Sequence, residues 1–129
     1  MTPTNAISWF EIPVTDIARA QVFYETLLAQ TLHLEVFPMG TQTYTLAIFT
    51  ALDDGGQGCL QSGADTPKAS NEGTLVYLDC SPSIDAALAR AQTLDAQLLK
   101  PKTALPPGMG FIAHIQDPDG NRVGLHALA

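Results

Sequence analysis

Met109-Gly-Phe-Ile-Ala-His-Ile-Gln-Asp-Pro-Asp-Gly-Asn-Arg-Val-Gly-Leu-His126 is the stretch from which the fold of this chain is best predicted. It contains two β-prone runs on either side of the tetrapeptide Asp117-Pro118-Asp119-Gly120. Asp117 can accept a hydrogen bond from the backbone two residues on, Pro118 fixes φ at the first corner of a turn, and Gly120 tolerates a positive φ. A tight reversal between two alternating runs predicts a β-hairpin.

Alternation along these two runs separates an apolar face from a polar one, because residues two apart on a strand point to the same side of a sheet. The apolar side of the predicted hairpin suits packing against a helix, and it carries Phe111, Ala113, Ile115, Val123, Leu125 and Ala127. The other side carries Ile112, His114, Gln116, Arg122, Gly124 and His126. Two histidines around a glycine are unusual on a buried surface and typical of a pocket wall.

The composition limits the classes of function. The chain has 129 residues, enough for one domain, and its 6 Lys and Arg against 13 Asp and Glu give a formal net charge of −7. Such an acidic chain lacks the positive surface of a nucleic-acid-binding protein, and no apolar run approaches the ~20 residues of a membrane-spanning helix.

The compartment is predicted from the amino terminus and the cysteines. Residues Met1 to Asn5 show neither a charged nor an apolar segment of a secretion signal. Cys59 and Cys80 lie in apolar runs that favour buried, reduced thiols, with a disulfide as the alternative. We expect a single cytoplasmic domain over residues 1–129, with neither nucleic acid nor membrane as a partner.

The rest of the chain predicts one arrangement twice. The first copy comprises strand 7–14, a helix capped by Thr15 or Asp16, and strands 32–37, 44–50 and 58–61. The second comprises strand 74–80, a helix capped by Ser83, a strand that opens at 98, and the hairpin. The turn at Asp53-Asp54-Gly55-Gly56 in the first copy matches the turn at Asp117-Pro118-Asp119-Gly120 in the second.

These patterns predict two βαβββ modules, residues 7–61 and 73–128, joined by a polar linker at 62–72. A helix on one side of each sheet leaves the other side open, so two modules can bring their sheets together around a shared cleft. The predicted fold is therefore α+β, a curled, cleft-bearing mixed sheet with its helices on the outside. The linker permits either a closed monomer or an exchange of modules between two chains, and we expect a homodimer.

The run Asp-Pro-Asp-Gly-Asn-Arg-Val-x-Leu at residues 117–125 resembles the end of proteins of the vicinal oxygen chelate superfamily. That superfamily includes glyoxalase I, extradiol dioxygenases, fosfomycin-resistance enzymes and bleomycin-resistance proteins. The resemblance covers nearly the whole chain and implies the layout of two modules around a cleft. In the usual pattern the last strand supplies a metal-binding Glu, and this chain has Gly124 at that place.

The resemblance also implies where the other metal ligands would lie. These positions hold Trp9, then Leu60 or Gln61, then Thr74 or Leu75. None of these side chains is a good ligand for Zn²⁺, Ni²⁺ or Fe²⁺, which prefer imidazole, thiolate or carboxylate. We therefore expect no metal cofactor, and the alternative is a relocated site formed by His114, His126 and Glu11.

The side chains expected on the cleft are candidates for binding a ligand: Trp9, Glu11, Tyr77, Asp79, His114, Gly124 and His126. His114 and Glu11 are also candidates for a general base. The loop 105–110 either covers the mouth of the cleft or simply connects two strands. The predicted function is to bind a small aromatic or amphipathic molecule in a metal-free cleft, as bleomycin-resistance proteins do. The alternatives are a lyase or oxygenase of the glyoxalase I type and a purely structural domain.

Overall fold

The structure, a computed structural model, describes residues 6–49 and 58–129. The predicted turn at residues 53–56 lies outside them. Within the described residues the chain order is β1 (Phe10–Pro13), α1 (Ile17–Leu28), β2 (Leu32–Met39), β3 (Gln42–Phe49), β4 (Gly58–Ser62), β5 (Val76–Asp79), α2 (Ile84–Thr93), β6 (Gln97–Ala104), β7 (Phe111–Gln116) and β8 (Arg122–Ala127).

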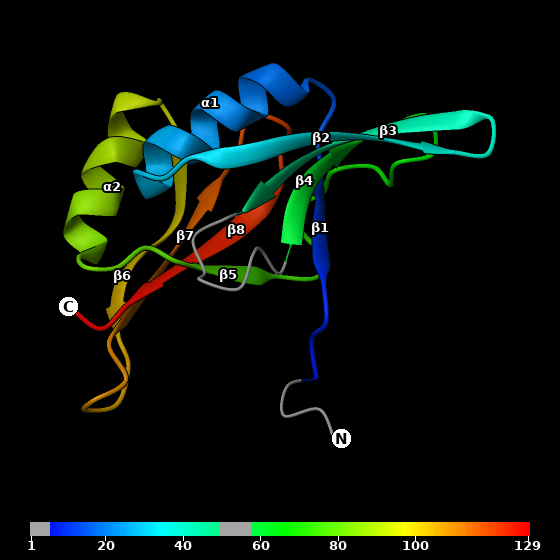
Figure 1. The fold of residues 1–129 in the computed structure, drawn as a ribbon. Helices are drawn as coiled ribbons and strands as arrows, with labels where there is room; N and C mark the ends of the chain where they lie inside the picture. The colour runs from blue at the N-terminus through cyan, green and yellow to red at the C-terminus, as the bar shows by residue number, and fades with distance from the viewer. Residues whose placement is uncertain (1–5, 50–57) are drawn as a thin grey trace.

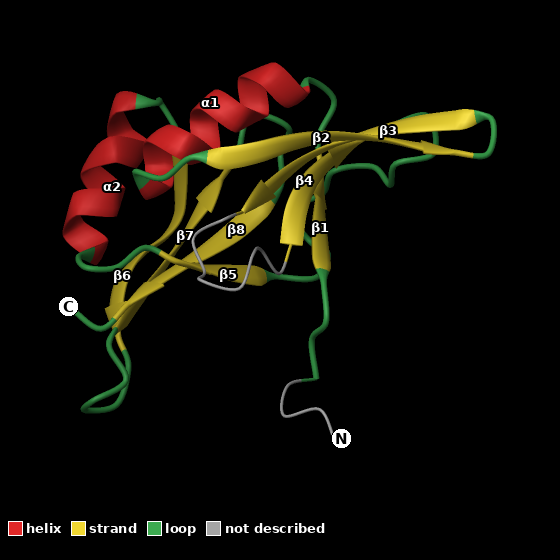
Figure 2. Cartoon of the chain, viewed as in Figure 1, coloured by secondary structure: helices red, strands yellow, loops and turns green. Residues whose placement is uncertain are grey.

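Eight strands form two mixed sheets of four, one from each half of the chain (Figure 1). Sheet A has the order β1-β4-β3-β2 and sheet B the order β5-β8-β7-β6. β1 pairs in parallel with β4, and β5 pairs in parallel with β8. All other neighbouring strands in the two sheets are antiparallel. Helices α1 and α2 pack against each other on one side of the sheets (Figure 2), and the sheets do not close into a barrel. The predicted α+β class is confirmed.

The strand boundaries differ from the predicted ones where proline intervenes. β1 spans four residues rather than eight: it begins at Phe10 and ends at Pro13, which the edge position of this strand in sheet A tolerates. β6 continues to Ala104 past Pro101, and its pairing with β7 shifts register between Lys100 and Thr103. An edge strand tolerates such a proline because one side of it has no partner strand.

Both helices begin at the capping residues that the sequence predicts. The Asp16 carboxylate accepts a hydrogen bond from the Arg19 amide at 3.1 Å, and the Ser83 hydroxyl accepts one from the Ala86 amide at 3.2 Å. Each bond satisfies an amide that the helix itself leaves unpaired.

The helices and the inner faces of both sheets enclose one continuous core. Its largest fully buried side chains come from both halves of the chain: Tyr24, Leu27, Leu60, Ile84, Ile115, Leu125 and Val123. Burying each of the aliphatic ones contributes about 1.5–3 kcal/mol to the free energy of unfolding. The two sheets are therefore parts of one folded unit.

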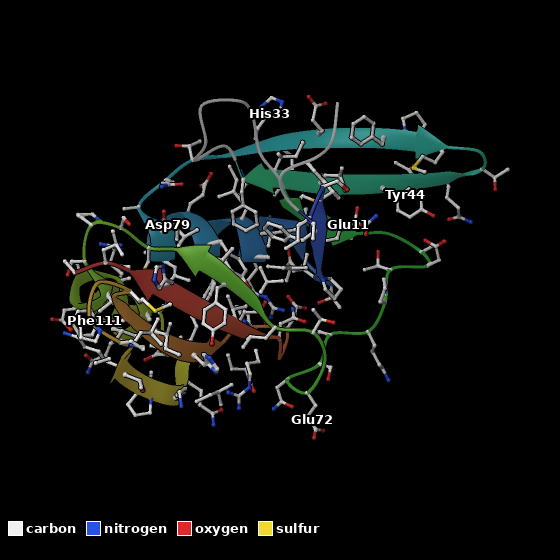
Figure 3. The ribbon with its side chains drawn as sticks, turned by 90° about the horizontal axis from the view of Figure 1, so that it is seen from below. Glu11, His33, Tyr44, Glu72, Asp79 and Phe111 are labelled. Atoms are coloured by element: carbon white, nitrogen blue, oxygen red, sulfur yellow. The ribbon has the colours of Figure 1, made fainter. Side chains whose placement is uncertain are left out.

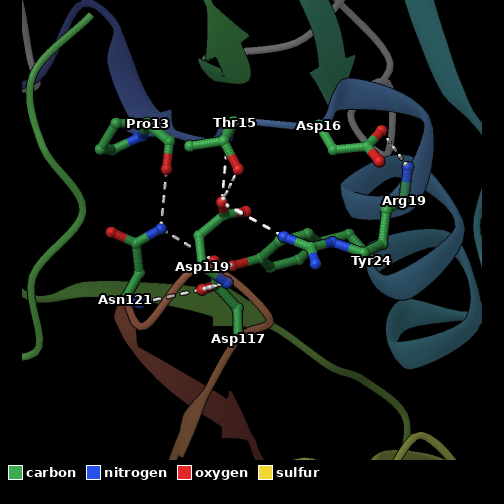
Figure 4. Close-up of polar contacts among 8 residues, drawn as sticks. All are labelled: Pro13, Thr15, Asp16, Arg19, Tyr24, Asp117, Asp119 and Asn121. Atoms are coloured by element: carbon green, nitrogen blue, oxygen red, sulfur yellow. Dashed lines mark hydrogen bonds and ion pairs between the residues drawn. The ribbon is translucent and has the colours of Figure 1, made fainter.

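The predicted Asp117 turn lies at the junction of the two halves (Figure 4). Asp117 accepts a hydrogen bond from the amide of Asp119 at 2.9 Å, as predicted, and Gly120 has φ of +95°. The other Asp117 carboxylate oxygen accepts a hydrogen bond from the buried Tyr24 hydroxyl of α1 at 2.6 Å. Burial, together with the Asp117 carboxylate, raises the pKa of Tyr24 well above its ordinary value.

Two further side chains of this turn reach the end of β1 and the residues that follow it. The Asn121 side-chain amide donates to the Pro13 carbonyl at 2.8 Å, and the Thr15 hydroxyl donates to the Asp119 carboxylate at 2.6 Å. We call Tyr24, Asp117, Asp119 and Asn121 the junction cluster. Its residues carry the sequence motif and hold the two halves of the chain together.

Cys59 and Cys80 are buried and free, as the sequence predicts. Neither helix in the described residues is long and apolar enough to cross a bilayer.

Candidate functional site

A hollow of about 400 Å³ lies on the side of sheet B that faces away from the helices. It is lined by Tyr77, Leu78, Asp79, Leu105, Ile112 and His126, and we call it the β5–β8 cleft. Figure 3 views the molecule from this side, with Asp79 and Glu11 labelled. Cross-strand partners point to the same side of a sheet. Tyr77 pairs with Gly124, and both Asp79 and Ile112 pair with His126, so these side chains lie together on the cleft side of sheet B.

Three side chains from adjoining strands form a chain of hydrogen bonds beside this cleft. The Tyr77 hydroxyl of β5 lies 2.7 Å from Nε2 of His114 on β7, and the Arg122 guanidinium of β8 lies 2.8 Å from Nδ1 of the same ring. The Tyr77 and His114 rings meet edge to face, with centroids 5.4 Å apart. His114 is buried, whereas Tyr77 is 44% exposed. The structure thus connects two predicted site residues through direct contacts.

The surroundings of His114 favour its neutral form. Burial lowers the pKa of its imidazole, and the positive charges of Arg122 and Lys100 lower it further. Since Arg122 occupies one ring nitrogen and Tyr77 the other, neither nitrogen is open to a ligand. In this arrangement the His114 ring contacts the Tyr77 hydroxyl on one side and the Arg122 guanidinium on the other.

Gly124 allows the close approach of the Tyr77 ring. A Cβ atom at Gly124 would lie 2.4 Å from Cδ1 of Tyr77, far inside van der Waals contact. Tyr77 therefore fills the space that a side chain at this position would need, including the Glu that the superfamily pattern places there. An aromatic ring over a cross-strand glycine also shields the backbone that the glycine exposes.

The two remaining polar residues of the cleft, Asp79 and His126, have local partners. Asp79 accepts hydrogen bonds from the amide and the hydroxyl of Ser81, which lower the pKa of its carboxyl group. Nε2 of His126 lies 2.8 Å from the carbonyl oxygen of Met109 and donates to it. Met109 belongs to the 105–110 loop, and Leu105 of the same loop lines the cleft. The loop therefore contacts the cleft at two residues.

Glu11 lies on β1 of the neighbouring sheet A, and Trp9 directly precedes that strand. The indole N–H of Trp9 donates to the Glu11 carboxylate at 3.3 Å, and both side chains are exposed. Burial, and then the charge of Glu11, raises the pKa of the nearby Cys59 thiol to about 12, which disfavours its thiolate form. A second hollow of about 230 Å³ at the junction of the sheets is lined in part by Glu11, Thr74 and Arg122.

The side chains at the inherited metal positions do not fit a metal ion. Trp9 offers only a donor N–H, Gly124 lies under the Tyr77 ring, and Leu60 is fully buried in the core. Gln61 and Thr74 offer only weak neutral oxygen ligands. No three His, Cys, Asp or Glu side chains converge to hold a metal ion within residues 6–49 and 58–129, and the Glu11 carboxylate accepts its hydrogen bond from Trp9.

Sequence reasoning missed the role of Arg122 and the lining residues Leu105 and Ile112. Arg122 and Ile112 lie on the same face as His114 and Gly124, so alternation along the hairpin was sufficient to include them. Leu105 belongs to a loop, and nothing in the sequence fixes where that loop packs. His33 is exposed on β2 and lies 2.7 Å from Glu35 of the same strand.

A larger hollow of about 540 Å³ lies on the opposite side of sheet B, between α2 and β6. Its lining comprises Asp85, Leu88, Ala89, Ala91, Gln92, Ala96, Leu98 and Ile115. It holds no aromatic side chain and no histidine, so it offers little that would orient a ligand. The β5–β8 cleft is therefore the better candidate site.

Two four-stranded mixed sheets with paired helices on one side and an open face on the other define a known class of protein. A model of the Glyoxalase/Bleomycin resistance protein/Dioxygenase superfamily matches residues 6–125. The chain belongs to this superfamily, and the resemblance seen in the Asp117 motif is confirmed. The comparison with curated proteins gives no match.

Solved structures share the fold at low sequence identity. A glyoxylase/bleomycin resistance protein/dioxygenase domain from Frankia sp. has a TM-score of 0.66 at 15% identity, covering 98% of both chains. The antibiotic binding protein TnmS3 from Streptomyces sp. has a TM-score of 0.63 at 22% sequence identity, covering 100% of both chains. The fosfomycin resistance protein FosX from Listeria monocytogenes has a TM-score of 0.62 at 17% sequence identity, covering 97% of this chain and 94% of the FosX chain.

Proposed function

We propose that this protein binds a small aromatic or amphipathic molecule in the β5–β8 cleft without a metal ion. The observation that carries the proposal is the make-up of the cleft, in which apolar side chains surround Tyr77, Asp79 and His126. Small-molecule sites are typically concave and largely apolar, with a few placed polar groups that orient the ligand. A volume of about 400 Å³ is within the usual range for such sites.

Two further observations support a binding protein over an enzyme. The inherited metal positions carry poor ligands, and both ring nitrogens of His114 are occupied by protein partners. One structural neighbour, TnmS3, is described as an antibiotic binding protein. The alternative is a lyase or oxygenase of the glyoxalase I type, with a rearranged metal site or with His114 or Glu11 as its general base.

A fluorescent apolar probe tests the proposal. Phenylnaphthylamine becomes bright on entering an apolar site, and we expect saturable binding in buffer that contains EDTA. Ile112→Lys places a charge in the β5–β8 cleft and should weaken binding at least about tenfold, since a buried unpaired charge is costly. The matched control Leu98→Lys alters the hollow beneath α2 and should leave the affinity unchanged. The reverse pattern, or no saturable binding, would contradict the proposal.

We also propose that the protein is a homodimer, supported by an exposed apolar edge. β2 is the edge strand of sheet A, and the β2–β3 hairpin extends beyond the rest of the molecule (Figure 1). Leu34, Val36, Phe37 and Met39 of β2 are all more than 40% exposed. An edge strand with such side chains is a surface on which another chain can pack.

Light scattering of the purified protein tests the dimer. We expect a mass of twice 13.7 kDa at micromolar concentration. Val36→Lys on β2 should shift the protein toward the monomer, whereas Val22→Lys, at an equally exposed position on α1, should not. A wild-type mass of 13.7 kDa would remove this part of the proposal.

A further inference from the structure

The hydrogen-bond chain from Arg122 through His114 to Tyr77 has a direction. An arginine side chain has only donors, so Nδ1 of His114 must be the acceptor at their 2.8 Å contact. The neutral imidazole then carries its hydrogen on Nε2, the nitrogen that lies 2.7 Å from the Tyr77 oxygen. His114 is the donor in that second bond, and the Tyr77 oxygen is the acceptor.

This direction leaves the hydroxyl hydrogen of Tyr77 for another partner. Among residues 6–49 and 58–129, His114 is the only hydrogen-bond partner of the Tyr77 hydroxyl. The Tyr77 ring is held in place on one face by the Gly124 backbone, which approaches so closely that no Cβ would fit. The Tyr77 side chain lines the β5–β8 cleft, its oxygen accepts from His114, and its hydroxyl hydrogen is left to donate, an arrangement that suits recognition of an acceptor atom.

We propose that Tyr77 is the specificity-determining hydrogen-bond donor of the cleft, and that it selects aromatic ligands bearing a carbonyl oxygen. His114 and Arg122 are positioning residues that hold the Tyr77 hydroxyl as a donor. This inference rests on the proposed function, because it names the class of ligand that the same cleft takes.

A neutral carbonyl fits the charges around the cleft better than a carboxylate or phosphate. Asp79 lines the cleft as a carboxylate held by Ser81, and the chain as a whole has a formal charge of −7. Both repel an anion. Arg122 and Lys100 place positive charge near His114, but the Arg122 guanidinium already donates to Nδ1 of that ring. A ligand that lacks an acceptor oxygen would leave the Tyr77 hydroxyl without its partner on exclusion of water, which lowers its affinity.

Two matched probes test the proposal. One is a dimethylaminonaphthalene bearing a propionyl group, whose emission shifts to the red when its carbonyl accepts a hydrogen bond. The other bears a propyl group and differs only in lacking the carbonyl oxygen. Wild-type protein should bind the ketone about fivefold more tightly, the ratio expected for one net hydrogen bond.

Tyr77→Phe should abolish the red shift and bring the affinities for the two probes together, because it removes both the bond to the ketone and the unpaired hydroxyl that disfavours the propyl probe. Tyr44→Phe, which removes a tyrosine hydroxyl from β3, is the control and should keep the preference. Equal weakening of both probes by Tyr77→Phe would overturn the inference, because Tyr77 would then contribute packing alone. Failure of both probes to bind would instead remove the proposed function, and this inference with it.

A separate measurement tests the positioning roles of His114 and Arg122. Nuclear magnetic resonance of the three histidines should find His114 with its hydrogen on Nε2. Arg122→Met should release that tautomer and reduce the ketone preference, and Arg122→Lys, which keeps a donor, should restore both. A hydrogen on Nδ1 of His114 in the wild-type protein would overturn the inference whatever the probes show.

Discussion

Gly120 turns the chain with φ of +95°, and a Cβ there would meet nothing within 4 Å. The cost of a side chain at Gly120 is therefore purely conformational. Gly120→Ala should lower the free energy of unfolding by about 1 kcal/mol, measured by urea denaturation.

Gly73 provides a matched control for this prediction. It also has open space around its Cα, but it does not adopt a positive φ. Gly73→Ala should be neutral or slightly stabilising, because it only restricts the unfolded chain. Equal effects of the two substitutions would mean that the turn geometry described for Gly120 is wrong.

The lowered pKa of His114 predicts how stability depends on pH. The ordinary pKa of this imidazole is 6.5, and burial with Arg122 and Lys100 holds the folded value below it. Between the two values the unfolded chain binds more protons, so stability rises with pH in that window. The contribution is complete above pH 6.5 and is lost as the pH falls toward the folded value.

Thermal unfolding at a series of pH values measures this contribution. His114→Gln should flatten the fall in melting temperature just below pH 6.5, whereas His33→Gln, on the exposed strand β2, should leave the part due to His114 in place. If the His114 variant retains the full wild-type slope, its imidazole is not held neutral by Arg122.

At the scale of elements, the junction cluster gives the sequence motif a structural role. The Tyr24 hydroxyl of α1 donates to the buried carboxylate of Asp117 at 2.6 Å. Tyr24→Phe removes that donor and leaves the carboxylate oxygen with Asn121 alone, at 2.9 Å. Because the bond is buried and one partner is charged, the expected loss is about 1–3 kcal/mol of unfolding free energy.

Tyr44→Phe is the control for this prediction, since Tyr44 also bonds an aspartate, Asp65, but lies outside the buried core. It should cost much less in the same denaturation experiment. A loss for Tyr24→Phe no larger than that for Tyr44→Phe would show that the junction cluster does not hold the two halves together.

The hairpin could be predicted in detail because its turn chemistry and its alternation are local properties of the sequence. Residues 111–116 and 122–127 form the strands, and the predicted apolar face is buried. The contact between Asp117 and Tyr24 could not be predicted, since 93 residues separate them and only the packing of the halves brings them together.

The candidate site could be predicted only in part for the same reason. Alternation placed His114, Gly124 and His126 on one face, which the register confirms. That Tyr77 lies over Gly124 and reaches His114 depends on the parallel pairing of β5 with β8. Such long-range pairing leaves no local signal in the sequence.

At the scale of the whole molecule, the account predicts that divalent metal leaves stability unchanged. A ligand raises the melting temperature only if it binds the folded state, by RT ln(1 + [L]/Kd). Ni²⁺ or Zn²⁺ at micromolar concentration should therefore have almost no effect on the wild-type protein. Gly124→Glu should not recruit metal either, because one carboxylate does not make a site and Tyr77 occupies its space.

A rise of many degrees in wild-type protein would contradict this prediction. If His114→Ala or His126→Ala abolished such a rise, the protein would have a relocated metal site, and the enzyme alternative would be favoured. A rise that neither substitution altered would place the metal elsewhere on the chain.

The central claim is that the β5–β8 cleft binds a small molecule without metal, and amide nuclear magnetic resonance tests it most directly. Isotope-labelled protein in EDTA is titrated with phenylnaphthylamine while the signal of each residue is followed. The account predicts saturable shifts at Tyr77, Asp79, Ile112 and His126, and none at Leu88, Gln92 and Leu98 beneath α2. Shifts confined to the α2 hollow, or shifts in the cleft that require added metal, would contradict it.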